Sequence, residues 1–389
     1  MDFTLSPAQL ELQERARVAG EAIRHRAARW DRENHVPYQE VVDHVRNHDL
    51  LALTVPVEYG GKGLSALDYL VVVEALFRSS QFWIVGEPVF ATAGPGPSMM
   101  LLAENPATRE KFLPGLVKGE QQCAIALTEP GYGSDLTSLE TTAVKDGDSY
   151  IISGDKNFVT GAQVNDLYAV FARFDDIPGH RGIGAVVIEK GTEGFHIDDG
   201  PEFLGCRGVP HGDLRIEDVR VPAENVIVGP GKFAKLMSAF NMERLHNCGF
   251  NLGMASAAYD EAQKYVSERK AFGRPIAEFQ SVYHTLVDMW TDIEALRLMA
   301  QRAACTAGDG SHPKVLETTA AKLYGARVAS GITLKALELH GGYGATTGYP
   351  IERLHRDVVA TIVAGGSPPV LRNSIAATLM PDTRISQRG

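Results

Sequence analysis

The spacing of apolar positions divides the chain into parts with different hydrophobic periodicity. Over residues 1 to about 120, apolar residues recur at helical spacing in YQEVVDHVRNHDLLAL, ALDYLVVVEALFRSS and TREKFLPGLVKG, with Gly and Pro in the breaks. From Gln121 the apolar segments become short and often alternating, as in QQCAIALTEP and DLRIEDVRVP. Turn residues fall about every 8 to 12 positions there, which predicts a small antiparallel barrel or sandwich.

Longer helical patterns return from about Lys232. They run through KFAKLMSAFNMERLHNCGFNLGMASAAYDEAQKYVSERKAF, FQSVYHTLVDMWTDIEALRLMAQRAACTAG and HPKVLETTAAKLYGARVASGITLKALELHGG. Long antiparallel helices of this kind pack as a bundle. We therefore predict an α+β fold, with an N-terminal helical domain (1–120), a middle antiparallel β-barrel domain (121–231) and a C-terminal four-helix bundle (232–389). Ser6 and Pro7 are expected as the cap and first residue of the first helix.

Composition narrows the class of protein. A chain of 389 residues with 44% hydrophobic and 22% charged residues is typical of a soluble globular protein of two or three domains. A formal charge of −10 argues against nucleic acid as the main partner. The four cysteines, Cys123, Cys206, Cys248 and Cys305, are far apart and show no C-x-x-C spacing. We expect no metal site, and the absence of a signal peptide or a long apolar run predicts a cytoplasmic protein.

Three stretches in this order resemble the acyl-CoA dehydrogenase family of flavoenzymes over essentially the whole chain. They are LTEPGYGSD (127–135), ERKAFGRPIAEFQ (268–280) and LELHGGYGATTGYPIERLHRD (337–357). The resemblance implies FAD as cofactor, a CoA thioester as substrate and α,β-dehydrogenation as the reaction. It also implies a homotetramer that passes electrons to an electron-transferring flavoprotein.

One set of residues is expected beside the flavin ring. A turn after Leu127-Thr128 would present N–H groups and hydroxyls suited to the hydrogen-bonding edge of an isoalloxazine, although an ordinary hairpin turn has the same pattern. The resemblance assigns contacts with the flavin or the pantetheine arm to Leu127, Thr128, Gly133 and Ser134. It places Phe158 and Thr160 where relatives commonly have Trp-Ile-Thr, and Phe158 cannot donate the hydrogen bond of an indole.

A second set is expected around the rest of FAD. In the family, counterparts of Arg269, Phe272 and Gln280 reach the FAD of a neighbouring subunit, and an arginine fork suits pyrophosphate. Gly341 and Gly342 follow a helix end and do not match a Rossmann fingerprint. The resemblance also assigns Glu338 and Ser367 to the cofactor. Glu338 and Pro369 each stand where relatives commonly have a glutamine, so the resemblance is weaker around the adenosine part of FAD.

The expected catalytic base is missing from the C-terminal loop. Most relatives carry a glutamate eight residues after the counterpart of Asp357, where this chain has Gly365. The resemblance leaves Gly365 a backbone role, in which its N–H donates to the thioester carbonyl. Glu243 interrupts a mostly apolar helix stripe near Leu236 and Phe250, which fits either a solvated glutamate or a placed base.

The isovaleryl-CoA and long-chain branches of the family carry their glutamate at the position of Glu243, followed by Arg-Leu as here. We therefore expect Glu243 to take the α-proton. Arg244 is expected to contact the CoA chain or to hold that carboxylate. Asn241 and Ser134 are expected to contact substrate, Asn241 because relatives often have an aspartate near the CoA at its position.

Other functions remain open from the sequence. The AGGS loop resembles that of the sulfinopropionyl-CoA desulfinases, but the segment 80–94 holds no arginine or lysine to bind a sulfinate. An enoyl-CoA reductase and a non-catalytic binding protein are further alternatives. Aromatic and Met residues in this region are typical of a pocket for a branched, cyclic or otherwise bulky acyl group, or of plain helix core. They are Phe82, Trp83, Phe90, Met99 and Met100.

Overall fold

The computed structural model describes residues 3–308 and 312–383. Its N-terminal part is helical, as expected. The first helix begins with a capping box, in which Ser6 accepts from the Gln9 backbone and Pro7 is the first helical residue. The helices of this part are α1 (Pro7–Arg24), α2 (Ala27–Glu33), α3 (Tyr38–Asn47), α4 (Ala66–Ser80), α5 (Glu87–Ala93), α6 (Pro95–Leu101) and α7 (Pro106–Lys118).

The middle part is one sheet in the order β6-β7-β3-β2-β4-β5-β8, and β1 pairs with β4. Most pairs are antiparallel, as predicted, but β1 and β2 each run parallel to β4. The strands are β1 (Cys123–Ala126), β2 (Thr142–Asp146), β3 (Ser149–Thr160), β4 (Leu167–Phe174), β5 (Ile183–Glu189), β6 (Phe195–Asp199), β7 (His211–Pro222) and β8 (Val226–Val228).

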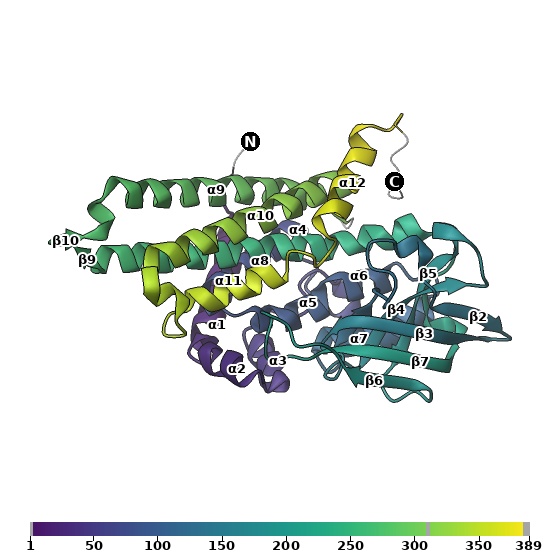
Figure 1. The fold of residues 1–389 in the computed structure, drawn as a ribbon. Coiled ribbons are helices and arrows are strands. Elements are labelled where there is room, and N and C mark those ends of the chain that lie inside the picture. The colour runs from purple at the N-terminus through teal and green to yellow at the C-terminus, as the bar shows by residue number, and fades with distance from the viewer. Residues whose placement is uncertain (1–2, 309–311, 384–389) are drawn as a thin grey trace.

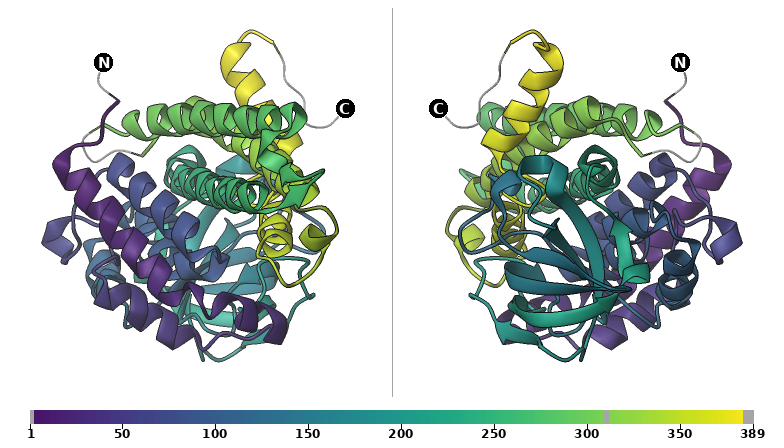
Figure 2. Two further views of the ribbon diagram at one scale, coloured as in Figure 1. Left: turned by 90° about the vertical axis from the view of Figure 1, so that its left-hand side faces the viewer. Right: turned by 90° about the vertical axis from the view of Figure 1, so that its right-hand side faces the viewer.

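Long helices form the C-terminal part, with α8 running the length of the molecule between the other elements (Figure 1). A short hairpin of β9 (Lys270–Ala271) and β10 (Arg274–Pro275) connects α8 to α9 at the end of the bundle remote from the sheet. The helices are α8 (Phe233–Glu268), α9 (Gln280–Cys305), α10 (Val315–His340), α11 (Ile351–Ala360) and α12 (Pro368–Leu379). Figure 2 shows α12 projecting from the body of the fold.

The Pro368-Pro369 pair begins α12. Proline is well suited to the first turn of a helix, because the N–H group that it lacks has no partner there. The pair therefore has a structural role at the start of this helix, directly after the loop that carries Gly365.

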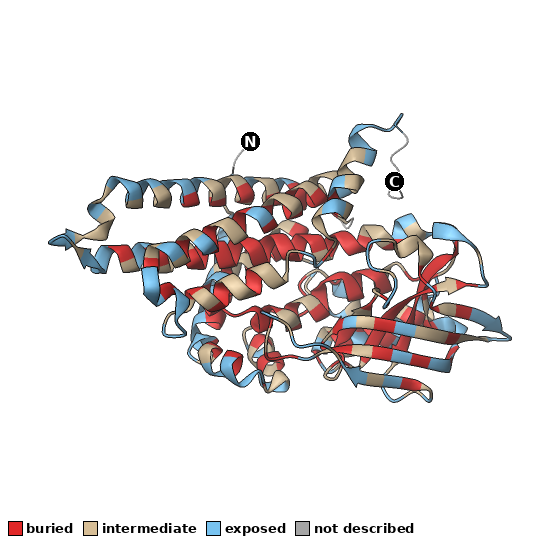
Figure 3. Cartoon of the chain, in the orientation of Figure 1, coloured by how far each residue is buried: buried red, intermediate tan, exposed pale blue. Residues whose placement is uncertain are grey.

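The core is continuous along α8, which is buried on nearly all sides where it meets α4 and α10 (Figure 3). Four of the residues considered for the acyl pocket, Phe82, Trp83, Met99 and Met100, are buried in the hydrophobic clusters. Within the described residues, no helix is long and apolar enough to span a membrane.

Candidate active site

Glu243 stands out on α8 by its exposure. Every residue from 239 to 258 is buried except Glu243, which is only partly covered. A glutamate on a helix that is buried on both sides of it can reach water only through a local opening. The side chain therefore lies at such an opening and is not one of the solvated glutamates of an outer helix face.

The carboxylate of Glu243 lies against Gly365. A Cβ atom at position 365 would be 3.3 Å from Oε1 of Glu243 and 2.8 Å from Nδ2 of Asn247. The backbone of Gly365 has φ of +67°, which favours glycine. A side chain at position 365 would thus crowd both Asn247 and the Glu243 carboxylate, and the positive φ disfavours it further.

Two buried cations hold the loop around Gly365. Nε of Arg244 donates to the Gly365 carbonyl at 3.2 Å, and Nζ of Lys322 donates to the carbonyls of Ile362 at 2.7 Å and Gly366 at 3.0 Å. Arg244 also donates to Oδ1 of Asn241 at 3.0 Å. Two of the three side chains that were expected to touch substrate, Arg244 and Asn241, are thus buried and bound to protein atoms.

The same surroundings set the charge of Glu243. Burial raises the pKa of the Glu243 carboxyl to about 7, against the opposing effects of Arg244, Lys322 and a hydrogen bond from the Gly365 backbone. Burial also lowers the pKa of Lys322 to about 8. A carboxyl that titrates near neutrality is suited to exchange protons with a carbon acid.

Glu87 and Lys322 are functional candidates that sequence reasoning missed. Burial, followed by the charge of Glu243, raises the pKa of Glu87 to about 8, so the two carboxyls lie near each other. The signal for Glu87 was available, because it is the one charged residue in SQFWIVGEPVFATAG (80–94). Nothing in the pattern of α10 distinguishes Lys322 from a surface lysine.

The residues expected beside the flavin gather where the sheet meets the C-terminal loop. Oγ of Ser134 lies 3.5 Å from Oγ of Ser367, which joins the turn after β1 to the start of α12. The Asn157 backbone donates to the Thr128 carbonyl at 2.8 Å and ties that turn to β3. Gly133 is exposed, with only a Thr128 methyl within 4 Å of a Cβ position.

A buried ion pair supports this turn from below. Nζ of Lys156 lies 2.7 Å from Oε1 of Glu129, and both side chains are almost fully buried. Lys156 also donates to the Leu127 carbonyl at 3.3 Å, while Glu129 accepts from the Glu140 and Thr141 backbones. The pair therefore fixes the backbone that carries Leu127 and Thr128.

Phe158 occupies a bulge in β3. Its φ is +59°, the register between β3 and β7 shifts between Lys156 and Val159, and its ring is 52% exposed. Thr160 follows at the end of the strand, paired with His211. The bulge leaves the Phe158 ring half exposed, edge-on to Phe203 at 6.2 Å between ring centroids.

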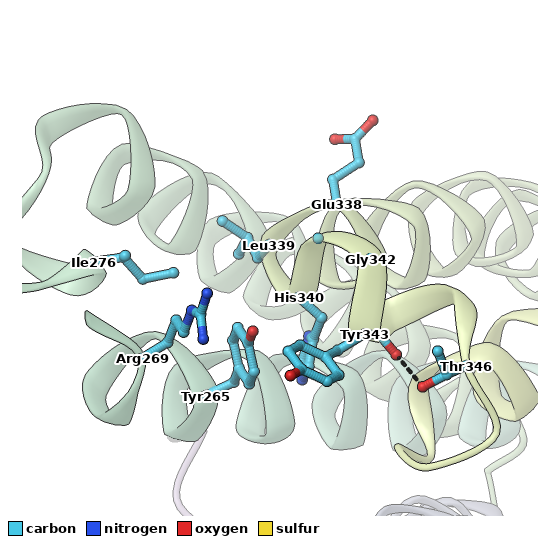
Figure 4. Close-up of a pocket in the computed structure, with 10 residues that line it drawn as sticks. Tyr265, Arg269, Ile276, Glu338, Leu339, His340, Gly342, Tyr343 and Thr346 are labelled. Carbon is cyan, nitrogen blue, oxygen red and sulfur yellow. Dashed lines mark hydrogen bonds between the residues drawn. The ribbon is translucent and has the colours of Figure 1, made fainter. Parts of the chain in front are cut away.

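The second set of cofactor candidates lies at the other end of α8 (Figure 1). Arg269, Glu338, Gly341 and Gly342 line one pocket of about 450 Å³ together with Tyr265 and Tyr343. Phe272 is 94% exposed at the tip of the β9–β10 hairpin, and Gln280 is exposed at the start of α9. Figure 4 shows the Glu338 carboxylate pointing away from Arg269, so the acidic replacement does not face the pocket centre.

The chemistry of this pocket fits part of an FAD molecule. Arg269 is exposed and makes no ion pair with any described residue, so its guanidinium is available for a pyrophosphate. Positions 341 and 342 have open space where a Cβ would stand. His340 donates through Nδ1 to the Ala336 carbonyl at 2.7 Å, which leaves its buried Nε2 as an acceptor that no described residue satisfies.

Comparisons with known proteins identify the same family along nearly the whole chain. Family models of the acyl-CoA dehydrogenase N-terminal, middle and C-terminal domains match residues 6–120, 124–219 and 233–380. A 3-sulfinopropanoyl-CoA desulfinase from Paraburkholderia xenovorans is 34% identical over 99% of each chain. A subunit of the caffeyl-CoA reductase–Etf complex of Acetobacterium woodii is 33% identical over 88% of this chain and 90% of that subunit.

A solved structure gives the same answer for the fold. Butyryl-CoA dehydrogenase from Megasphaera elsdenii superposes with a TM-score of 0.92 and 31% identity, covering 98% of this chain and 100% of that one. The order of helical, β and helical parts is the same as in the family models. The chain belongs to the acyl-CoA dehydrogenase family of FAD-dependent flavin oxidoreductases.

Proposed function

We propose that this enzyme dehydrogenates an acyl-CoA thioester between Cα and Cβ, with Glu243 as the base. The contact between the Glu243 carboxylate and Gly365 carries the proposal, because Gly365 stands where the C-terminal loop of most relatives carries the base. In this chain the carboxylate beside the loop therefore belongs to a residue of α8 and not to a residue of the loop itself.

In this mechanism the carboxylate of Glu243 removes the α-proton of the thioester. The backbone N–H of Gly365, which donates to the Glu243 carboxylate in the free enzyme, would turn to the thioester carbonyl when substrate binds, where negative charge develops as the proton leaves. Arg244 and Lys322 fix that N–H by holding the loop through its carbonyls. Bound FAD supplies the acceptor for the hydride that leaves Cβ.

The residues that would hold FAD come from the middle and C-terminal parts of the chain. Leu127, Thr128, Gly133, Ser134, Phe158, Thr160 and Ser367 would surround the flavin, and Arg269, Phe272, Gln280, Glu338, Gly341 and Gly342 would hold the remainder. Since these sets lie at opposite ends of α8, each cofactor site would be completed by a second copy of the chain.

The bundle surface supports such an assembly. Large apolar side chains lie exposed along α9, spaced as on one helix face and unmatched by any described element. They are Tyr283, Val287, Trp290 and Leu298. We propose a homotetramer as in the family, with an electron-transferring flavoprotein as redox partner, as the name of the Acetobacterium relative indicates for that protein. All four cysteines are free, which supports a reducing, cytoplasmic location.

Desulfination is the less favoured alternative, despite the similarity to a desulfinase. A sulfinate needs a cation, but Glu87 and Phe90 are the partly exposed residues of segment 79–100. The cations that act on Glu243, Arg244 and Lys322, are buried and bound to loop carbonyls. Exchange of the α-proton of butyryl-CoA with D₂O, followed by NMR, tests the proposed base. The wild-type enzyme should catalyse the exchange and Glu243→Gln should not; equal exchange by both would remove Glu243 from the mechanism.

A further inference from the structure

Two buried segments of the chain each contain a glutamate that keeps some accessible surface. Every residue from 79 to 100 is buried except Glu87 and Phe90, and every residue from 239 to 258 is buried except Glu243. Side chains that keep accessible surface within such segments mark an opening between the packed elements. Glu87 and Phe90 mark it on α5, and Glu243 marks it on α8.

These residues mark the same opening. Phe90 lies one helical turn after Glu87, and its ring centroid is 5.0 Å from that of His246, which lies one turn after Glu243. The two faces of α5 and α8 are thus opposed, and the charge of Glu243 acts directly on Glu87. An acyl group whose α-carbon is next to Glu243 would meet Glu87 and Phe90.

The Glu87 carboxyl has no protein partner of its own. No described residue forms a hydrogen bond or ion pair with it, and burial together with the nearby Glu243 charge raises its pKa to about 8. His246 is not a cationic partner for Glu87, because its Nδ1 is hydrogen-bonded to the Tyr69 hydroxyl at 2.8 Å and burial lowers its pKa to about 3. A partly buried carboxyl without a partner costs free energy, and a hydrocarbon acyl chain would not supply one.

We propose that Glu87 is a substrate-specificity residue, which binds a hydroxyl group on the acyl chain and disfavours acyl chains that end in an anion. A hydroxyl both donates and accepts, so it can bind the carboxyl in either protonation state. A carboxylate or sulfinate would instead lie near Glu243, which must be ionised to act as the base, and the two cations that act on Glu243, Arg244 and Lys322, are themselves buried. This inference rests on the proposed function, because it places the acyl group beside Glu243.

The test is calorimetric titration of the FAD-loaded enzyme with CoA thioesters of equal acyl length. Valeryl-, 3-hydroxyvaleryl-, 5-hydroxyvaleryl- and glutaryl-CoA are compared in the wild type, Glu87→Gln and Glu87→Leu. We expect the wild type to bind at least one hydroxyvaleryl-CoA about tenfold tighter than valeryl-CoA, and glutaryl-CoA most weakly, since one good hydrogen bond is worth about 1.4 kcal/mol. Glu87→Gln should keep most of the preference for the hydroxyl, and Glu87→Leu should lose it.

Glu58→Gln serves as the matched control, because it removes an exposed carboxylate elsewhere on the N-terminal domain. The proposal fails if the wild type binds neither hydroxyvaleryl-CoA better than valeryl-CoA, or if Glu87→Leu keeps the preference. It also fails if Glu87→Gln loses flavin bleaching with every thioester, since Glu87 would then serve proton transfer. Binding and bleaching are separate readouts, so a wild type that prefers the hydroxyl without bleaching would refute only the dehydrogenase proposal.

Discussion

A Cβ atom at Gly365 would lie 3.3 Å from Oε1 of Glu243, so a loop residue and a helix carboxylate compete for one place. The AGGS loop therefore leaves room for the Glu243 carboxylate, which comes from α8. Arg244 and Lys322, which donate to carbonyls of the loop, hold the loop beside that carboxylate.

Gly365→Ala should lower kcat/KM at least tenfold while FAD content stays close to that of the wild type. The added methyl group would meet Nδ2 of Asn247 at 2.8 Å, and the residue would keep a φ that alanine adopts at a cost of about 1 kcal/mol. Steady-state kinetics and the flavin absorbance of the purified protein measure the two effects. Gly229→Ala is the control, because nothing lies within 4 Å of its Cβ position; equal activity of both variants would contradict the close contact.

The pH dependence of kcat/KM should follow the Glu243 carboxyl. Because the base must be deprotonated and burial raises its pKa to about 7, activity should fall about tenfold per pH unit below that value. Lys322→Met removes a positive charge that lowers this pKa, so the acidic limb should move to higher pH. Lys264→Met, an exposed change on the same helix as Glu243, should leave the limb in place. An unchanged profile in Lys322→Met would show that another group is being titrated.

Glu87 should make the enzyme less stable in alkali. A carboxyl whose pKa is raised by folding favours the folded state below its unfolded pKa, and this contribution is lost as pH rises through about 8. Glu87→Gln cannot ionise, so its Tm should exceed that of the wild type by several degrees at pH 9 and by much less at pH 5. Thermal unfolding at both pH values measures this difference, and Glu58→Gln should show no such dependence. A Tm difference that is the same at both pH values would mean that Glu87 is not buried as described.

The Lys156–Glu129 pair should be needed for flavin binding. Burial acts to raise the pKa of Glu129, but Lys156 and the backbone donors hold it below its usual range. Lys156→Met would leave a buried carboxylate unpaired, at a cost of about 3–5 kcal/mol. Tm and FAD content should both fall, whereas Lys145→Met on the exposed side of β2 should change neither. Retention of full FAD content would show that the turn at Leu127 is held by other contacts.

The sequence predicted the order of helical, β and helical parts because the apolar periodicity changes clearly at each transition. Glu243 could be singled out because one carboxylate interrupts a mostly apolar stripe on a long helix and because the family resemblance places a glutamate in this helix. Glu87 could not be paired with it, since that relationship depends on how α5 packs over α8 in three dimensions. The direction of the Glu338 side chain and the use of Pro368-Pro369 to begin α12 likewise depend on tertiary placement.

The central claim is that Glu243 is the base, and anaerobic reduction of the bound flavin tests it most directly. Purified Glu243→Gln is mixed with a panel of acyl-CoA thioesters without oxygen, and the flavin absorbance near its long-wavelength maximum is followed beside the wild type. We predict that the wild type bleaches with at least one thioester, while Glu243→Gln carries the same amount of FAD and does not bleach. Bleaching of the variant at the wild-type rate would contradict the account.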